Sequence, residues 1–265
     1  MVKETEISAT ASRESVAYWA SIPYSAIAKL PDNQLQFLLT STRIANDILL
    51  LQRLVIAVEN SRRHSDHDEI QAGVIAWFTG LALLSGKLWE GYLALSRYAR
   101  LWRPDSAIKL SLSGDEARIS INKYFANGSP LEKIRNASAF HYDGKDVLAS
   151  EVSEFRKLMA GDSSMKWILG SEIANTYYLF SAASNGFAIL DAAYPSLPRP
   201  TQMLSLYDDV IGAADAMGKF LMHAITSILS QPGIEADLKI LLEPISMRGR
   251  PNVNELTFFM LARTD

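Results

Sequence analysis

The stretch that decides the fold is residues 68–102, DEIQAGVIAWFTGLALLSGKLWEGYLALSRYARLW. Its first half is apolar on nearly every side of a helix, which indicates a central helix enclosed by others. Its second half becomes amphipathic through the charged residues Lys87, Glu90, Arg97 and Arg100. The most apolar part, residues 72–86, is shorter than a membrane-spanning helix requires. We therefore interpret the stretch as a core helix and expect no membrane contact.

A second long helix is predicted before it, over residues 32–60, where apolar residues recur at helical spacing. The polar segment between the two predicts a loop, and short loops join antiparallel neighbours. We therefore expect 32–60 and 68–102 to form an antiparallel core pair. A capping box of Ser113 and Glu116 predicts the start of a further helix. Including this helix, the remaining expected helices cover residues near 13–21, 113–126, 130–143, 145–160, 165–190 and 201–230.

The C-terminal part of the chain has a different pattern. Residues 240–242 and 256–261 are rich in large apolar side chains and could form the two strands of a small β-hairpin. The predicted fold class is an all-α multi-helix bundle with this hairpin as a small addition. Residues 1–194 would form a helical domain. Residues 195–265 would add a helix and a short extended segment on the same core, giving one domain overall.

The composition is that of an ordinary globular protein. The chain has 265 residues, of which 48% are hydrophobic, and a net charge of -3. Nucleic-acid-binding proteins usually carry a basic surface, so DNA binding is not expected, and RNA binding would need a local basic group. The absence of cysteine excludes disulfides, thiolate metal sites and cysteine nucleophiles. The first residues are polar and lack the apolar core of a signal peptide, so we expect a cytoplasmic protein.

One segment combines marked helix ends with residue types suited to chemistry, residues 129–144, SPLEKIRNASAFHYDG. Ser129 is a favourable N-cap, and Pro130 fits the first helical position. Glu132 completes a capping box with Ser129. Gly144 is suited to end the helix. The segment therefore predicts one short helix.

Inside this helix Arg135 and Asn136 are adjacent, and four residues separate them from His141. This arrangement resembles the motif of the HEPN superfamily of helical proteins, an arginine with a polar neighbour and a histidine, with four to six residues between the arginine and the histidine. The phrase from Ile134 to Asp143 also resembles uncharacterised bacterial and phage-defence-like members. The resemblance implies an HEPN-like helical bundle, a homodimer, and, in catalytic members, a metal-independent ribonuclease that needs no cofactor. It also implies a toxin or phage-defence setting.

The resemblance assigns a role to each residue of the motif. His141 would be the general acid and base, because an imidazole with an unperturbed pKa of about 6.5 gives and takes protons near neutrality. Arg135 would clamp the phosphate of the RNA partner through its planar fork of N–H groups. Asn136 would orient one of these groups. The supporting residues would be Tyr142, Asp143 and Glu90.

The spacing of the motif gives partial support to the dimer that the resemblance implies. Arg135 and His141 are six residues apart, so on one ideal helix they point about 120° apart. Two such helices crossing at a symmetric interface could bring one arginine to the histidine of the other chain. The small residues Ala137 and Ala139 would permit that close approach.

The same residues also have a structural interpretation, which the sequence leaves open. His141 lies near a helix C-terminus, where the helix dipole favours a protonated imidazole. Arg135 could form an ion pair with Glu132, Asp143 or Glu90. The alternative function is therefore a non-catalytic helical interaction or ligand-binding protein in which the motif is structural.

Two other polar segments are interpreted as ordinary surface. His64 and His67 lie in a polar loop without the further convergent ligands that a zinc site needs, so no metal is expected. Arg248-Gly249-Arg250-Pro251 resembles the core of a DNA-binding AT-hook but lacks basic residues on both sides, and a tight turn is the better interpretation. Four tryptophans are expected to be core or interface anchors: Trp77, Trp89, Trp102 and Trp167.

Overall fold

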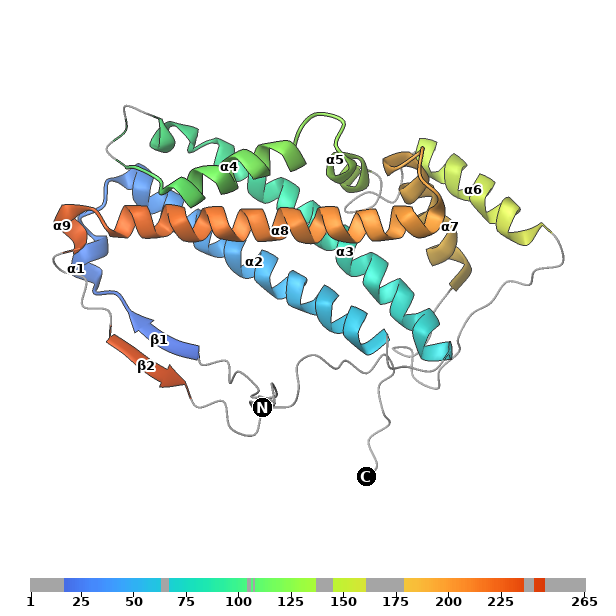
Figure 1. Ribbon diagram of the computed structural model, residues 1–265, viewed down its shortest axis with the longest axis horizontal. Helices are drawn as coiled ribbons and strands as arrows, with labels where there is room; N and C mark the ends of the chain where they lie inside the picture. The colour runs from blue at the N-terminus through green and yellow to red at the C-terminus, as the bar shows by residue number, and fades with distance from the viewer. Residues whose placement is uncertain are drawn as a thin grey trace, which may run out of the picture.

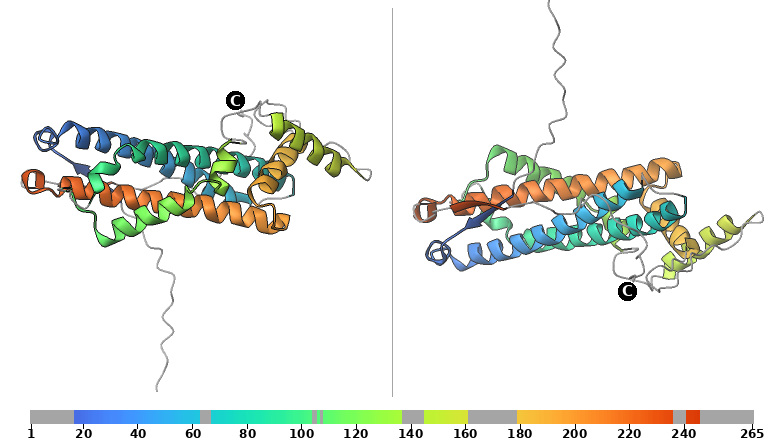
Figure 2. Two further views of the ribbon diagram at one scale, coloured as in Figure 1. Left: turned by 90° about the horizontal axis from the view of Figure 1, so that it is seen from above. Right: turned by 90° about the horizontal axis from the view of Figure 1, so that it is seen from below.

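The computed structural model describes residues 17–62, 67–103, 106, 108–136, 145–160, 179–235 and 241–245. Within them the protein is an all-α multi-helix bundle, as the sequence predicted, with one pair of short strands. The long helices are α2 (Asp32–Arg62), α3 (His67–Ser96) and α8 (Arg199–Leu229). Figures 1 and 2 show these three helices side by side, with the shorter α4 (Leu112–Tyr124) next to α8.

The pair formed by α2 and α3 is antiparallel, as predicted (Figure 1). Two glycines of α3 let α2 approach closely. A Cβ atom on Gly91 would lie 2.9 Å from Cγ2 of Ile44, and one on Gly80 would lie 3.0 Å from Cγ2 of Val55. The two contacts are eleven residues apart on each helix, as an antiparallel register requires. The glycines therefore help to set how the core pair is aligned.

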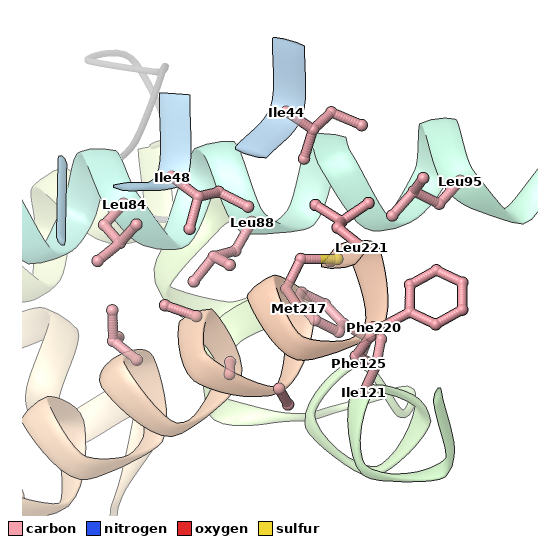
Figure 3. Close-up of a cluster of buried hydrophobic side chains, with 14 of the residues drawn as sticks. Ile44, Ile48, Leu84, Leu88, Leu95, Ile121, Phe125, Met217, Phe220 and Leu221 are labelled. Atoms are coloured by element: carbon pink, nitrogen blue, oxygen red, sulfur yellow. The ribbon is translucent and has the colours of Figure 1, made fainter. Parts of the chain in front are cut away.

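The hydrophobic core lies where α2, α3, α4 and α8 meet. Leu84, Leu88 and Met217 have no exposed surface, and burial of each such side chain is worth about 1.5–3 kcal/mol. Figure 3 shows side chains of all four helices converging there: Ile44, Ile48, Leu84, Leu88, Leu95, Ile121, Phe125, Met217, Phe220 and Leu221. The apolar first half of the 68–102 stretch thus contributes Leu81 and Leu84 to the core, but it is enclosed on only part of its surface, since Leu83 is 40% exposed.

The helix α3 is apolar enough to be compared with a membrane span. Among the described residues, the segment Ala72–Ser96 could cross a membrane if length and composition alone are considered. Half of its apolar window is buried inside the bundle. Leu81, Leu84 and Leu88 on this segment are 0% exposed, so the helix contributes directly to the core.

The end of α3 differs from the prediction. The α-helix stops at Ser96, and Ala99–Trp102 form the 3₁₀ turn η1. The N–H of Tyr98 donates to the carbonyl of Leu95, and that of Leu101 to the carbonyl of Tyr98, both at 2.9 Å. These bonds span three residues instead of four and wind the chain more tightly. The expected helix to residue 102 is therefore one α-helix followed by a 3₁₀ turn.

The shorter helices follow the predicted order with shifted ends. The predicted helix 145–160 is confirmed as α6, and 201–230 as α8, while the described part of 165–190 begins at residue 179. The shorter helices are α1 (Tyr24–Ile27), α5 (Pro130–Ile134), α6 (Lys145–Met159), α7 (Leu179–Ala193) and α9 (Pro232–Glu235). The helices α6 and α7 pack on each other at one end of the bundle, and α1 and α9 meet at the other (Figure 1).

Two short strands join segments near the two ends of the chain. The strands β1 (Ala17–Ser21) and β2 (Leu241–Ile245) pair antiparallel. Pro244 stands opposite Tyr18 in this pair. Proline lacks an N–H donor and is accepted on an edge strand, and in a two-stranded sheet each strand is an edge.

The strand pair corrects two expectations. A helix over residues 13–21 is wrong for its described part, since residues 17–21 form β1. A strand near 240–242 is present, but it pairs with β1, while the expected partner 256–261 lies outside the described residues. The local sequence pattern predicts neither β1 nor its pairing with β2, because the two strands come from opposite ends of the chain.

The start of α4 also differs from the predicted capping box. Its N-cap is Ser111, whose Oγ accepts a hydrogen bond from the N–H of Gly114 at 3.2 Å. The same Oγ lies 3.0 Å from Nδ1 of His223 on α8. Gly114 is packed so closely that a Cβ there would lie 2.9 Å from Cβ of His223. Packing against α8 therefore selects Ser111 over Ser113.

Two matched serine variants test this start of α4. Replacing Ser111 by alanine is expected to lower the free energy of unfolding by about 1 kcal/mol, because an N-cap hydrogen bond is lost. Replacing Ser113, which is exposed, should change it by less than about 0.5 kcal/mol. Urea denaturation of both variants gives the comparison. Equal losses would contradict Ser111 as the cap.

Candidate functional site

The helix α5 begins as the sequence predicted, with one difference. Ser129 is the N-cap, and its Oγ accepts a hydrogen bond from the N–H of Glu132 at 3.3 Å. The carboxylate of Glu132 accepts a return bond from the N–H of Gly128 at 2.6 Å, one residue before the N-cap. Gly128 has φ of +75°, a left-handed conformation that glycine adopts without strain. The capping box is thus present with a shifted return bond.

The apolar residues of α5 anchor it in the bundle. Leu131 and Ile134 are each 1% exposed, and α5 contacts α3, α7 and α8. Arg135 follows Ile134 directly and is the C-cap residue. Its backbone position is therefore held by the core, although its side chain reaches the surface.

The guanidinium of Arg135 has two partners within the chain. Its Nη2 donates to Oε1 of Glu90 on α3 at 2.9 Å, and its Nη1 donates to Oδ1 of Asn136 at 3.0 Å. Of the carboxylates that the sequence offered, Glu90 is the partner found, while Glu132 caps α5 and Asp143 lies outside the described residues. The Arg135 side chain is 29% exposed and that of Glu90 is 50% exposed.

This arrangement fixes the guanidinium without sealing it. An arginine has five N–H donors, and the two bonds use two of them. The Nε of Arg135 is buried without a partner among the described residues, and such orphaned donors call for a specific explanation because they are uncommon. Asn136 is exposed, and its amide nitrogen makes no bond to a described residue. Both side chains therefore have N–H groups that no described residue accepts from.

The remaining residues of the motif are not part of the described structure. His141, Tyr142 and Asp143 lie outside the described residues, so their roles stay predictions. The structure brings Arg135, Asn136 and Glu90 together. Asn136 accepts a hydrogen bond from Arg135, and its orienting role in catalysis stays a prediction.

A large groove lies beside the N-terminus of α5, between α4 and α8, with a volume of about 980 Å³. Its charged lining residues are Glu116, Lys123, Asp209, Asp215 and Lys219. Lys219 forms an ion pair with Asp215, so the described lining lacks the excess of positive charge that attracts a phosphate chain. It is therefore a poor site for RNA despite its size.

The structure provides no support for the metal site or the DNA-binding site that the sequence analysis considered. His64 and residues 248–251 lie outside the described residues, and His67 is the first residue of α3. In the part of the chain that the structure describes, no three His, Asp or Glu side chains gather into a group that could hold a metal ion.

The tryptophans have the structural role that was expected of them, as far as they are described. Trp77 is 4% exposed. Trp89 and Trp102 are partly buried and pack against the core, and Trp167 lies outside the described residues.

A second charged cluster joins α6, α7 and α8, and sequence reasoning missed it. Glu154 on α6 is only 3% exposed and forms ion pairs with Lys157 and Arg199. Arg199 lies 3.8 Å from Asp191 and places its guanidinium 4.2 Å from the centre of the Phe187 ring. Glu154 resembles an ordinary surface residue of an amphipathic helix, so no local signal marks its burial.

This cluster predicts an acid-dependent loss of stability. The hydrogen bond from Lys157 contributes most to holding the pKa of Glu154 below its ordinary value. The positive charges of Arg199 and Lys157 and the hydrogen bond from Arg199 act in the same direction, and burial acts in the opposite direction. A group whose pKa is lower in the folded state stabilises the protein at pH values above its unfolded pKa of about 4.3. This stabilisation is lost as the pH falls through the folded pKa. The free energy of unfolding should therefore drop below about pH 5, and less steeply in Glu154→Gln.

Glu151 provides the matched control on the same helix. Burial raises the pKa of Glu151, so this group opposes the loss of stability on acidification. Glu151→Gln should steepen the acid-induced loss, whereas Glu154→Gln flattens it. Urea denaturation between pH 3 and 7 distinguishes them. The same slope in both variants would contradict this account of the cluster.

Comparison with known proteins leaves the family of the chain open. No family model matches it, and no curated protein or solved structure is significantly similar to it. The class that the fold and site define is a multi-helix bundle with an anchored, partly exposed arginine at the end of a short capped helix.

Proposed function

We propose that the protein is a metal-independent endoribonuclease of the HEPN type, in which Arg135 clamps the phosphate and His141 transfers protons. The observation that supports this is the state of Arg135, held by two bonds and still 29% exposed. A side chain fixed before its ligand arrives loses little entropy on binding. A planar guanidinium with donors to spare suits a phosphate. The choice of RNA comes from the resemblance of the motif.

The reaction uses the 2′-hydroxyl of the RNA as its own nucleophile. The 2′-oxygen attacks phosphorus and gives its proton to a base, and the bond from phosphorus to the 5′-oxygen breaks as that oxygen takes a proton. The products are a 2′,3′-cyclic phosphate and a 5′-hydroxyl. An imidazole can perform either proton transfer, which is the role of His141. Arg135 stabilises the negative charge that develops on the phosphoryl oxygens.

The proposal includes a homodimer. On one ideal helix Arg135 and His141 would point about 120° apart, so one copy does not present both groups to one phosphate. In a symmetric dimer the arginine of one protomer and the histidine of the other act together. The ion pair with Glu90 then keeps Arg135 in place before the RNA binds.

The test of the function is RNA cleavage in the presence of a chelator. Wild type should degrade mixed RNA in EDTA, and His141→Ala should be slower by about 10²–10⁴-fold, the usual contribution of general acid–base catalysis. Lys133→Ala is a matched control, since Lys133 lies on the same helix and outside the motif. Equal degradation by wild type and His141→Ala, or none by either, would overturn the proposal.

A second candidate function is supported by the ion pair itself. Arg135 pairs with Glu90 within one chain, and a structural ion pair needs no substrate. In this alternative the protein is a non-catalytic helical interaction or ligand-binding protein. The absence of RNA cleavage, together with similar stability losses in Arg135→Ala and Glu90→Ala, would favour it.

The biological setting is part of the proposal and comes from the resemblance alone. It is a toxin or phage-defence role in the cytoplasm, where RNA is the substrate and DNA is not. DNA lacks the 2′-hydroxyl that the reaction requires, so a DNA strand of the same sequence should remain intact under the same conditions.

A further inference from the structure

A second cavity, with a volume of about 610 Å³, lies at the C-terminal end of α3. It is bounded by η1, by the chain that leads into α4, by α4 itself and by Phe220 of α8. Three of its apolar lining residues, Leu95, Ile108 and Ile121, belong to the buried core and are 7%, 3% and 4% exposed. The cavity therefore reaches from the surface to core side chains, and its size falls within the range of small-molecule sites.

Aromatic rings line this cavity in fixed orientations. Tyr92 stacks on Phe125 with ring centroids 4.7 Å apart and an interplanar angle of 8°. Trp102 meets Phe220 edge to face, at 5.9 Å and 80°, and meets Phe37 in the same manner, at 5.1 Å and 69°. Because Tyr92 and Trp102 are each held by a neighbouring ring, they occupy fixed positions in the lining.

The charged residues of the cavity are mainly basic. The charged residues that the structure describes in its lining are Arg103, Lys109, Arg118 and Asp115. Asp115 accepts a bond from Nε of Arg118 at 3.2 Å, which neutralises one of these charges. Arg103 is exposed and has no ion pair with a described residue. Among the described lining residues, basic side chains thus outnumber acidic ones, although the chain as a whole has a net charge of -3.

Aromatic side chains and a majority of basic residues in the described lining together suggest a ligand class. We propose that this cavity binds a small planar aromatic molecule that carries a negative group, with the ring between Tyr92 and Trp102 and the anion at Arg103. A simple packing defect would be apolar and would not need cations in its lining. The groove between α4 and α8 lacks this majority of basic residues in its described lining. The proposal is independent of RNA cleavage, because it concerns residues outside the motif.

Isothermal titration calorimetry with 2-naphthoate tests the ligand class directly. The expected dissociation constant is of the order of 10–100 μM, in line with the efficiency of small ligands. Two partial mimics separate the requirements: 2-naphthamide keeps the ring without the charge, and cyclohexanecarboxylate keeps the charge without the aromatic ring. Each should bind at least about tenfold more weakly, since it loses a charge-assisted bond or a ring contact. Equal binding of all three, or no binding of 2-naphthoate, would overturn the proposal.

Adenosine monophosphate forms a further arm, because an aromatic anion could be a carboxylate or a nucleotide. Tighter binding of the nucleotide identifies a phosphate-bearing ring as the ligand, and tighter binding of naphthoate identifies an aryl carboxylate. Either result supports an aromatic anion site, provided that the variants below lose binding.

Two exposed residues allow the site to be changed without altering the core. Arg103→Gln should weaken naphthoate binding by about tenfold or more, while Arg100→Gln, an exposed arginine of η1 outside the lining, should leave it unchanged. Ser96→Trp places a bulky side chain at an exposed lining position and should block the cavity. Circular dichroism checks that each variant is folded. Wild-type affinity in both Arg103→Gln and Ser96→Trp, or an equal loss in Arg100→Gln, would refute this location.

Discussion

Replacing Arg135 by alanine is expected to slow RNA cleavage by about 10²–10³-fold, the usual cost of removing one group that stabilises developing negative charge. The same change should alter the free energy of unfolding by less than about 1 kcal/mol, because an ion pair between partly exposed side chains contributes little. Arg135 is 29% exposed and Glu90 is 50% exposed. The buried, unpartnered Nε of Arg135 reduces the expected stability loss further, since the variant removes that group.

The comparison with other charged residues separates catalysis from structure. Arg118→Ala is the matched control, because Arg118 is also partly exposed and ion-paired, with Asp115 at 3.2 Å. It should leave the cleavage rate unchanged. Glu90→Gln should slow cleavage much less than Arg135→Ala, since Glu90 only positions the arginine. Equal rates for Arg135→Ala and wild type would leave the ion pair as a structural feature alone.

Replacing Leu88 by alanine is expected to lower the free energy of unfolding by about 2–5 kcal/mol, the range for truncating a fully buried leucine. Leu88 is 0% exposed and lies where α2, α3, α4 and α8 meet (Figure 3). The truncated side chain would leave a cavity, and the four surrounding helices could fill it only by moving from their packed positions. A domain of this size has a total stability of only about 5–15 kcal/mol, so the variant would be severely weakened.

An exposed leucine of the same helix provides the control for Leu88. Leu93 is 41% exposed, so Leu93→Ala should cost less than about 1 kcal/mol. Guanidinium denaturation of the two variants gives the difference. A small loss in Leu88→Ala, or a similar loss in both, would show that α3 is not the enclosed helix at the centre of the bundle.

The central helices could be predicted from the sequence because their signals are local. Apolar spacing over 32–60 and 68–102 determines which faces are buried, and the caps at Ser129 and Pro130 lie within a few residues of the helix they start. The register between α2 and α3 has no such signal. It depends on contacts such as that of Gly91 with Ile44, which join residues far apart in the chain.

Three of the features that sequence reasoning missed depend on partners from distant segments. Ser111 is preferred over Ser113 because His223 of α8 lies beside it. The strand β1 forms because β2 supplies its hydrogen bonds. Glu154 is buried because Arg199 arrives at the same point of the bundle.

The sequence predicted which residues make up the candidate site but only part of how they are arranged. The sequence named Glu90 as one of three partners for Arg135, and the structure selects it. The choice depends on how α5 packs on α3, which no spacing within 129–144 reveals. The aromatic cavity near Trp102 had no sequence signal, because its walls come from α3, η1, α4 and α8.

The most direct test of the central claim is the chemistry of the RNA ends produced in EDTA. Phosphorus NMR of the products of purified wild type should show 2′,3′-cyclic phosphate that is absent with Arg135→Ala and His141→Ala. Cleavage that leaves 3′-hydroxyl ends, or cyclic phosphate produced equally by wild type and both variants, would contradict the assignment of Arg135 and His141 as the catalytic pair.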